Sequence, residues 1–141
     1  MEIRYAVESD LYRIAEMTRA LTLHLGAFEW TVENHLKHVK RRFSNSRYIH
    51  LVAVDDDKII GFTGAELKSK HTAYMMKGYV EPTSRRAGVM RQMESRLVEI
   101  LRDRGVSTLE LKVDSTNKEG RSTWVALGYQ TVRETMQKRL S

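Results

Sequence analysis

The feature that most constrains the fold is a helical stretch enclosed by two strand-like stretches. Ala73–Val80 is rich in β-forming residues, and Pro82, the only proline in the chain, ends it. Apolar residues then recur at helical spacing, at Val89, Met93, Leu97, Ile100 and Leu101. Thr108–Val113 is strand-like again. A strand, a crossover helix and a strand pack with the two strands parallel, so the sequence predicts a sheet layered with helices.

Hydrophobic periodicity predicts further elements in the rest of the chain. The strand-like stretches are Glu2–Ala6, Tyr48–Val54, Lys58–Leu67 and Tyr129–Arg139, and the helical stretches are Asp10–Leu25, 32–43 and 117–127. Ser9, Thr31 and Asn117 are placed to cap these three helices. The order β-α-α-β-β-β-α-β-α-β indicates an α/β or α+β fold with a mixed sheet. No repeat or linker interrupts it, so we expect one domain over residues 1–141.

Composition excludes several classes of site. The chain has no cysteine, which excludes disulfides, thiolate catalysis and cysteine-ligated metals. No apolar run approaches about 18 residues, so we expect no membrane span. The N-terminal segment is charged and lacks the apolar centre of a signal peptide, which favours a cytoplasmic protein. The net charge of +6 favours an anionic ligand or partner.

The strand-to-helix junction at residues 80–89 is basic. Arg85, Arg86 and Arg91 flank Gly88, which allows a ligand to approach the backbone closely. A helix N-terminus presents unpaired N–H groups and partial positive charge, and arginine binds phosphate through paired hydrogen bonds. The junction therefore indicates a phosphate site, with a basic surface turn as the alternative. It matches neither the P-loop nor the dinucleotide-binding glycine motif.

The same junction resembles a motif of the GNAT family of N-acetyltransferases. Val80-x-Pro82 followed by Arg85-x-x-Gly88 is similar to the loop that binds the acyl-CoA pyrophosphate in that family. The family pattern continues with Gly or Ala where this chain has Met90. A long side chain at this position is a departure from the family, because the backbone is expected to approach the phosphates there.

A second segment resembles the same family. Residues 117–129 are similar to the run of Asn, small residue, aromatic residue and Gly-aromatic pair that follows the family's fifth strand. The aromatic residue here is Trp124, where the family most often has Tyr. In the family that hydroxyl is the usual candidate to protonate the leaving CoA thiolate, whereas an indole N–H only donates a hydrogen bond. Trp124 is therefore expected beside the thioester arm, with a core position on a short helix as the alternative.

The resemblance implies the acyl-CoA N-acyltransferase-like fold, a mixed, mostly antiparallel sheet of six to seven strands with helices on both faces. It implies direct transfer of an acetyl group from acetyl-CoA to a primary amine of a small molecule or peptide. Tyr79 and Val80 would hold the pantetheine arm, and Asn117 and Trp124 would lie beside it. The implied pyrophosphate contacts are Arg85, Arg86, Ala87, Gly88, Val89, Met90 and Arg91. A homodimer is a further expectation from the resemblance.

The catalytic candidates are Tyr74 and Glu66. Family members that use a base often carry a carboxylate on the fourth strand, at a position that is Tyr74 in this chain. Glu66 on the third strand is the nearest carboxylate that would line the cleft, with a solvated strand-end residue as the alternative. Glu81 is expected on the opposite face of the strand from Tyr74, because side chains alternate. Ordered water is the alternative proton acceptor.

Other polar residues have plainer interpretations. His35 and His38 have the i, i+3 spacing of a helical metal site, but no third ligand is near, so we expect exposed residues and no metal. The basic run at 37–42 is typical of a solvated helix face. In the family, the loop between the first two helices forms a wall of the acceptor site. The acceptor contacts that this implies are Leu23, His24, Phe28, Glu29 and Trp30.

Three classes of function remain open. The first is an active acetyltransferase, and the second is a non-catalytic acyl-CoA-binding domain on the same fold. The third is a basic module that binds nucleic acid or protein, which the interleaved acidic residues and the lack of a nucleic-acid motif disfavour. Binding of CoA separates the first two classes from the third, and turnover separates the first from the second.

Overall fold

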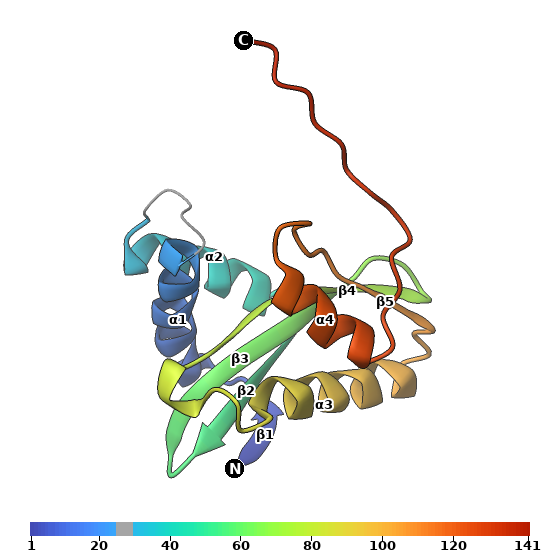
Figure 1. Cartoon of the computed structure of the whole chain (residues 1–141). Coiled ribbons are helices and arrows are strands. Elements are labelled where there is room, and N and C mark those ends of the chain that lie inside the picture. The colour runs from blue at the N-terminus through green and yellow to red at the C-terminus, as the bar shows by residue number, and fades with distance from the viewer. Residues whose placement is uncertain (25–29) are drawn as a thin grey trace. The chain divides into compact units, whose positions relative to one another are not determined.

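Strands that follow one another in the sequence are also neighbours in the sheet. In the computed structural model, which describes residues 1–24 and 30–141, the strands are β1 (Glu2–Tyr5), β2 (Tyr48–Asp55), β3 (Lys58–Leu67), β4 (Thr72–Val80) and β5 (Thr108–Glu110) (Figure 1). The first four strands pair antiparallel, and β4 pairs parallel with β5. The predicted mixed, mostly antiparallel sheet and the crossover are therefore confirmed.

Three helices belong to the same compact unit as the sheet, which spans Met1–Leu111. They are α1 (Leu11–His24), α2 (Val32–Phe43) and α3 (Val89–Asp103). Thr31 caps α2 as predicted, because its Oγ1 accepts a hydrogen bond from the backbone N–H of Asn34 at 3.2 Å. None of the helices in the described part of the chain has the length and apolar character that a membrane crossing requires.

The helices cover both faces of the sheet, as expected (Figure 1). The core under α1 and α2 contains Leu11, Ile14, Met17 and Val39 with Val52 and Phe62 from the sheet. The core under α3 contains Val89 and Met93 with Ala53, Ile60 and Val80. Met17 is 1% exposed and Met93 is fully buried, and each such side chain contributes about 1.5–3 kcal/mol to folding.

The second compact unit, Lys112–Ser141, contains helix α4 (Lys118–Ala126). Asn117 caps α4 as predicted, because its Oδ1 accepts a hydrogen bond from the backbone N–H of Gly120 at 3.0 Å. Gly128 follows the end of the helix with φ of 99°, a left-handed conformation that suits glycine.

The predicted final strand, Tyr129–Arg139, does not form. Residues 130–141 are exposed and lie in no strand or helix, and Val132 and Met136 are 70% and 91% exposed. Alternating side chains favour a strand only where a partner strand supplies the ladder hydrogen bonds and a face to pack on. The described residues therefore form five strands rather than six to seven. β5 is also shorter than predicted and ends at Glu110.

An ion pair fixes the entry to α1. Asp10 is 6% exposed and ends the short 3-10 turn η1 (Glu8–Asp10) that leads into the helix. Its carboxylate accepts hydrogen bonds from Arg4 Nη1 and Nη2 at 2.7 and 3.2 Å, and from the Val7 N–H at 2.8 Å. The Arg4 guanidinium, assisted by the Val7 N–H, holds the pKa of Asp10 below its ordinary value. Asp10, rather than the predicted Ser9, therefore caps this turn.

Asp10→Asn should lower the free energy of unfolding by about 1 to 2 kcal/mol at neutral pH, because the charge-assisted bonds to Arg4 are lost. The folded pKa of Asp10 lies below the unfolded one. The advantage of the wild type should therefore be complete above about pH 4 and shrink as pH falls through the folded pKa. Urea unfolding across this range measures the difference, with Glu8→Gln as control. An advantage that stays constant on acidification would contradict the assigned ion pair.

Candidate functional site

The pairing of β4 with β3 shifts between Met76 and Tyr79, where β4 places two residues opposite one residue of β3. The two residues are Lys77 and Gly78, and the one opposite them is Thr63. A bulge of this kind leaves its extra residue outside the regular ladder of hydrogen bonds. The middle of β4 therefore departs from regular pairing, and such a position suits contact between a ligand and the backbone.

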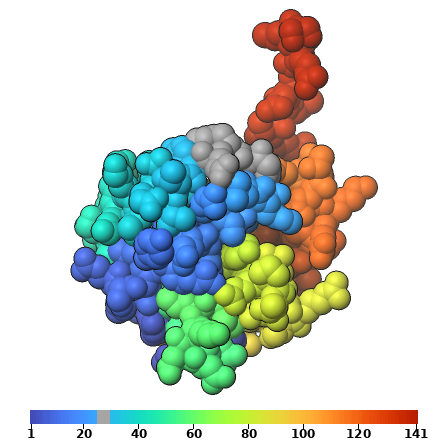
Figure 2. Space-filling model, turned by 90° about the vertical axis from the view of Figure 1, so that its left-hand side faces the viewer, coloured from blue at the N-terminus to red at the C-terminus, as the bar shows by residue number. Residues whose placement is uncertain are grey.

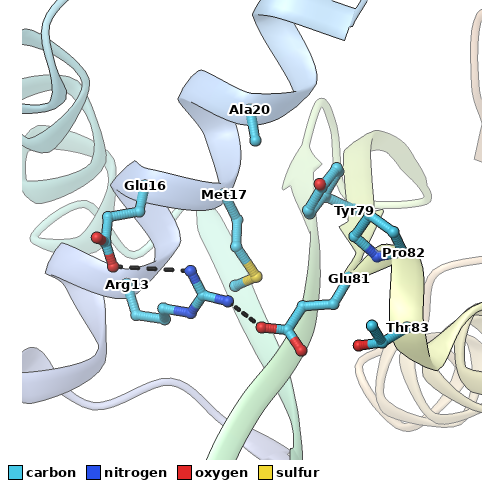
Figure 3. A pocket seen from close by; sticks show the side chains of 8 residues that line it. All are labelled: Arg13, Glu16, Met17, Ala20, Tyr79, Glu81, Pro82 and Thr83. Carbon is cyan, nitrogen blue, oxygen red and sulfur yellow. Dashed lines mark hydrogen bonds and ion pairs between the residues drawn. The ribbon is translucent and has the colours of Figure 1, made fainter.

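The bulge also changes which side chains face α1 and α2. Tyr74 lies on the same face of the sheet as Phe62, which belongs to the core under these helices. The extra residue reverses the alternation, so Tyr79 also packs against that core. Glu81 follows on the same face, where it forms an ion pair with Arg13 of α1 (Figure 3). The prediction that Glu81 lies on the opposite face from Tyr74 is therefore wrong.

Gly78 in the bulge leaves room for the side chain of Met90. A Cβ atom on Gly78 would lie 2.9 Å from Met90 Cε and 2.7 Å from the carbonyl oxygen of Phe62. Met90 packs against the core under α3. Its side chain therefore lies toward the sheet, and its length is accommodated on β4.

The loop that links β4 to α3 is exposed and has an unusual backbone. It contains the short 3-10 turn η2 (Pro82–Ser84), after which Arg86 and Gly88 adopt left-handed conformations with φ of 69° and 76°. A left-handed non-glycine residue such as Arg86 costs about 1–2 kcal/mol, and such strain concentrates at functional sites. Gly88 is the N-cap residue of α3 and has no side chain with which to cap the helix. The N–H groups of the first turn of α3 are thus left for an anion.

Arg85 fastens this loop to the end of β4. Its Nε donates a hydrogen bond to the carbonyl oxygen of Val80 at 2.9 Å. Its guanidinium carbon lies 5.2 Å from the centre of the Tyr79 ring, within cation–π range. Arg86 and Arg91 are exposed on the same loop and helix start. The loop thus has one arginine held against the strand and two at the surface.

Tyr74 and Glu66 are direct neighbours across β4 and β3. The Glu66 carboxylate forms ion pairs with Lys68 Nζ at 3.2 Å and Arg47 Nη1 at 3.8 Å. Lys68 Nζ also lies 5.7 Å from the centre of the Tyr74 ring. The structure therefore brings the two catalytic candidates together, with two cations already paired to the carboxylate.

A pocket of about 310 Å³ lies between α1 and the end of β4 (Figure 3). Figure 2 shows α1, in blue, beside the yellow-green loop that follows β4. Arg13 and Glu16 reach the pocket from α1, and Tyr79 and Glu81 reach it from β4 and its end. Arg13 and Glu16 are not among the site residues predicted from the sequence. Their i, i+3 spacing on one helix was the available signal, but nothing local linked them to Glu81.

The predicted acceptor contacts that belong to the described residues lie at the end of α1 and just before α2. Leu23 and His24 are exposed at the end of α1, and Phe28 and Glu29 lie outside the described residues. Trp30 is half-buried just before α2.

Trp30 packs against two histidines of α2. Its ring centre lies 4.5 Å from that of His38, in a stacked arrangement, and 5.4 Å from that of His35. His35 is 7% exposed and His38 is half-buried, so the prediction of exposed residues is wrong for both. Burial lowers the pKa of His35, and the nearby His38 and Arg19 lower it further. No group of three His, Asp or Glu side chains suited to a metal occurs within residues 1–24 and 30–141.

Asn117 and Trp124, the remaining predicted donor contacts, belong to the second unit. Asn117 uses its side-chain oxygen to cap α4. The half-buried Trp124 meets Tyr129 edge to face, with ring centres 5.6 Å apart. Within this unit, Trp124 is therefore held by an aromatic contact at the end of α4.

Comparison with known proteins agrees with this architecture. A possible acetyltransferase from Clostridium difficile 630 is 20% identical with a TM-score of 0.84, covering 99% of this chain and 97% of that one. A Bacillus halodurans protein is 22% identical with a TM-score of 0.84, covering 99% and 100%. Aminoglycoside N-acetyltransferase AAC(6')-Iy, solved with a CoA bisubstrate analogue, is 17% identical with a TM-score of 0.81, covering 99% and 97%.

At these identities the structural likeness shows a shared fold. No curated protein matches the sequence at a significant level. A family model described as "Acetyltransferase (GNAT) family" matches residues 10–129, which is most of the chain and includes the β4 bulge and the basic loop. The chain therefore belongs to the GNAT family of acetyltransferases.

Proposed function

We propose that the protein transfers the acetyl group of acetyl-CoA to a primary amine of a small molecule or peptide. The observation that supports this best is the exposed Gly88 at the N-cap of α3, a residue that has no side chain to cap the helix. It follows β4, a strand that has a bulge and pairs parallel with β5. A helix start of this kind suits a pyrophosphate, and a bulge N–H beside it suits a thioester carbonyl.

The donor-binding residues that we propose act mainly through their backbone. The N–H groups at the start of α3 would bind the pyrophosphate, and Arg86 and Arg91 would add positive charge. The backbone of β4 would hold the pantetheine arm as an added strand. Arg85 would act by fixing the loop on the Val80 carbonyl. The full proposed set is Tyr79, Val80, Arg85, Arg86, Ala87, Gly88, Val89, Met90 and Arg91, with Asn117 and Trp124.

The chemistry that we propose is direct attack. The neutral amine nitrogen forms a bond to the acetyl carbonyl carbon, and negative charge develops on the carbonyl oxygen. A backbone N–H at the β4 bulge would stabilise that charge, because it is held in place before the reaction. The carbon–sulfur bond then breaks, CoA leaves as the thiolate, and the amine proton passes to a base or to water.

Two features of the comparisons support an amine acceptor for this chain. Its fold is shared with an aminoglycoside N-acetyltransferase that was solved with a CoA bisubstrate analogue. Its family match is to acetyltransferases. A cytoplasmic location and a homodimer stay predictions from the sequence.

Gly88→Asp should weaken CoA binding at least tenfold, because it places a carboxylate where the pyrophosphate binds. Gly88→Asn is the matched control. Asn has the same shape without the charge, both residues tolerate the left-handed conformation, and the position has open space around it. Calorimetric titration with acetyl-CoA and desulfo-CoA measures the affinity. Pantetheine lacks the phosphates and should bind the Asp and Asn proteins equally.

Each outcome of this titration has a defined meaning. Unchanged CoA affinity in a folded Gly88→Asp protein would contradict the loop assignment. Equal losses in the Asp and Asn proteins would show that size, and not charge, disrupts the site. Tight CoA binding without turnover of any amine would instead support a non-catalytic acyl-CoA-binding domain.

Tyr74→Phe should lower kcat about tenfold, and Glu66→Gln should lower it less than threefold. The Glu66 carboxylate is already held in ion pairs by Lys68 and Arg47, so it is not free to approach the amine of an acceptor. The Tyr74 hydroxyl can donate a proton or relay one through water. Release of CoA at saturating acetyl-CoA measures both. A larger loss in Glu66→Gln would identify the carboxylate as the base despite its ion pairs.

A further inference from the structure

The pocket between α1 and the end of β4 has a charge opposite to that of the chain. Arg13 lies between two carboxylates, with Nη2 paired to Glu81 and Nη1 3.7 Å from Glu16 Oε1 (Figure 3). One guanidinium and two carboxylates give these three side chains a net charge of −1, whereas the whole chain carries +6. The three side chains are 29–43% exposed, so a ligand can reach them.

Apart from Thr83, the rest of the pocket lining is mainly apolar. Met17 and Ala20 lie on the α1 side, and the Tyr79 ring and Pro82 lie on the β4 side (Figure 3). The volume of about 310 Å³ is at the lower end of the range for small-ligand sites. Such a lining suits a short aliphatic chain that ends in a charged group.

The charges select a cation rather than an anion. A ligand carboxylate would have to compete with Glu16 and Glu81 for Arg13, and would bring a third negative charge into the pocket. A ligand ammonium would instead approach two carboxylates that share a single guanidinium. Glu81 already binds an internal cation, Arg13, which shows that its carboxylate points into the pocket.

The pocket lies at a defined distance from the proposed reaction centre. Glu81 follows Gly78 of the bulge by three residues, which corresponds to about 10 Å along a strand. Tyr79 and Glu81 both face α1, so the chain between bulge and pocket presents one continuous side. An acceptor with its reacting amine near the bulge would thus have its far end at Glu81.

We propose that Glu16 and Glu81 bind a second positive charge on the acceptor, so that the preferred acceptors are diamines or polyamines. The two nitrogens would be separated by an aliphatic spacer of roughly 7–10 Å, set by the strand spacing. This inference rests on the proposed function, because it assigns the acceptor class of the same site. Arg13 forms ion pairs with both carboxylates, and the ligand ammonium would bind beside it.

Three acceptors of equal length test the proposal. Hexamethylenediamine has the second ammonium, hexylamine lacks it, and ε-aminocaproate replaces it with a carboxylate. We expect kcat/KM to be at least tenfold higher for the diamine than for hexylamine, after correction for its two equivalent amines, and lowest for the carboxylate. Calorimetric titration of the same three compounds into the CoA-bound protein gives a readout that does not require turnover.

Variants that each remove one charge test whether the preference for the diamine depends on Glu16 and Glu81. Glu81→Gln and Glu16→Gln should each reduce the preference for the diamine over hexylamine by about threefold to tenfold, because each makes the pocket neutral. Glu16 is 43% exposed, so its variant carries little risk to folding. Glu99→Gln removes the same charge from α3, on the other face of the sheet, and should leave the preference as in the wild type.

The outcomes separate this proposal from the proposed function. Turnover of all three acceptors without a preference for the diamine, or with a preference for ε-aminocaproate, would overturn the diamine pocket and leave acetyl transfer intact. Tight diamine binding that needs Glu81, without acetylation, would support the pocket and overturn the transfer. Absence of both binding and turnover of the diamine would overturn the diamine pocket, and turnover of hexylamine in the same assay would leave acetyl transfer intact.

Discussion

One extra residue in β4 determines how the two faces of this strand are used. With strict alternation, Tyr79 and Glu81 would face α3, and Val80 would face α1 and α2. The bulge at Lys77 and Gly78 reverses this order. Val80 can then join the core under α3, while Tyr79 and Glu81 line a pocket beside α1. The proposed oxyanion donor and the acceptor pocket therefore depend on the same backbone irregularity.

The bulge also explains how the chain accommodates its departure from the family pattern. Gly78 has no side chain, and Met90 Cε occupies the space next to it. A small residue at position 90 would leave that space empty, and a larger residue at position 78 would meet the carbonyl oxygen of Phe62 at 2.7 Å. The two positions are therefore complementary in size. The long side chain of Met90 thus packs against the sheet at Gly78 and does not extend into the phosphate loop.

The sequence predicted those features that have a local cause. The apolar period of α3 and the caps at Thr31 and Asn117 need only neighbouring residues, and the structure contains them. The final strand failed because alternation in residues 129–139 says nothing about a partner strand. The face of Glu81 and its contact with Arg13, 68 residues away, depend on the bulge and on the packing of α1. Neither the face of Glu81 nor its contact with Arg13 can be predicted from the hydrophobic periodicity of the sequence.

Tyr79 connects the two charged regions of the site. Its ring supports the Arg85 guanidinium at 5.2 Å, and the same residue lines the pocket that contains Glu16 and Glu81. A basic loop for an anionic donor and an acidic pocket for a cationic acceptor need opposite potentials within a short stretch of chain. The Val80 carbonyl and the Tyr79 ring hold Arg85 in place, and Glu81 holds Arg13. Each arginine is therefore held by its own partners. Arg85 stays with the basic loop and Arg13 stays between the carboxylates, so a positive region and a negative region lie next to each other.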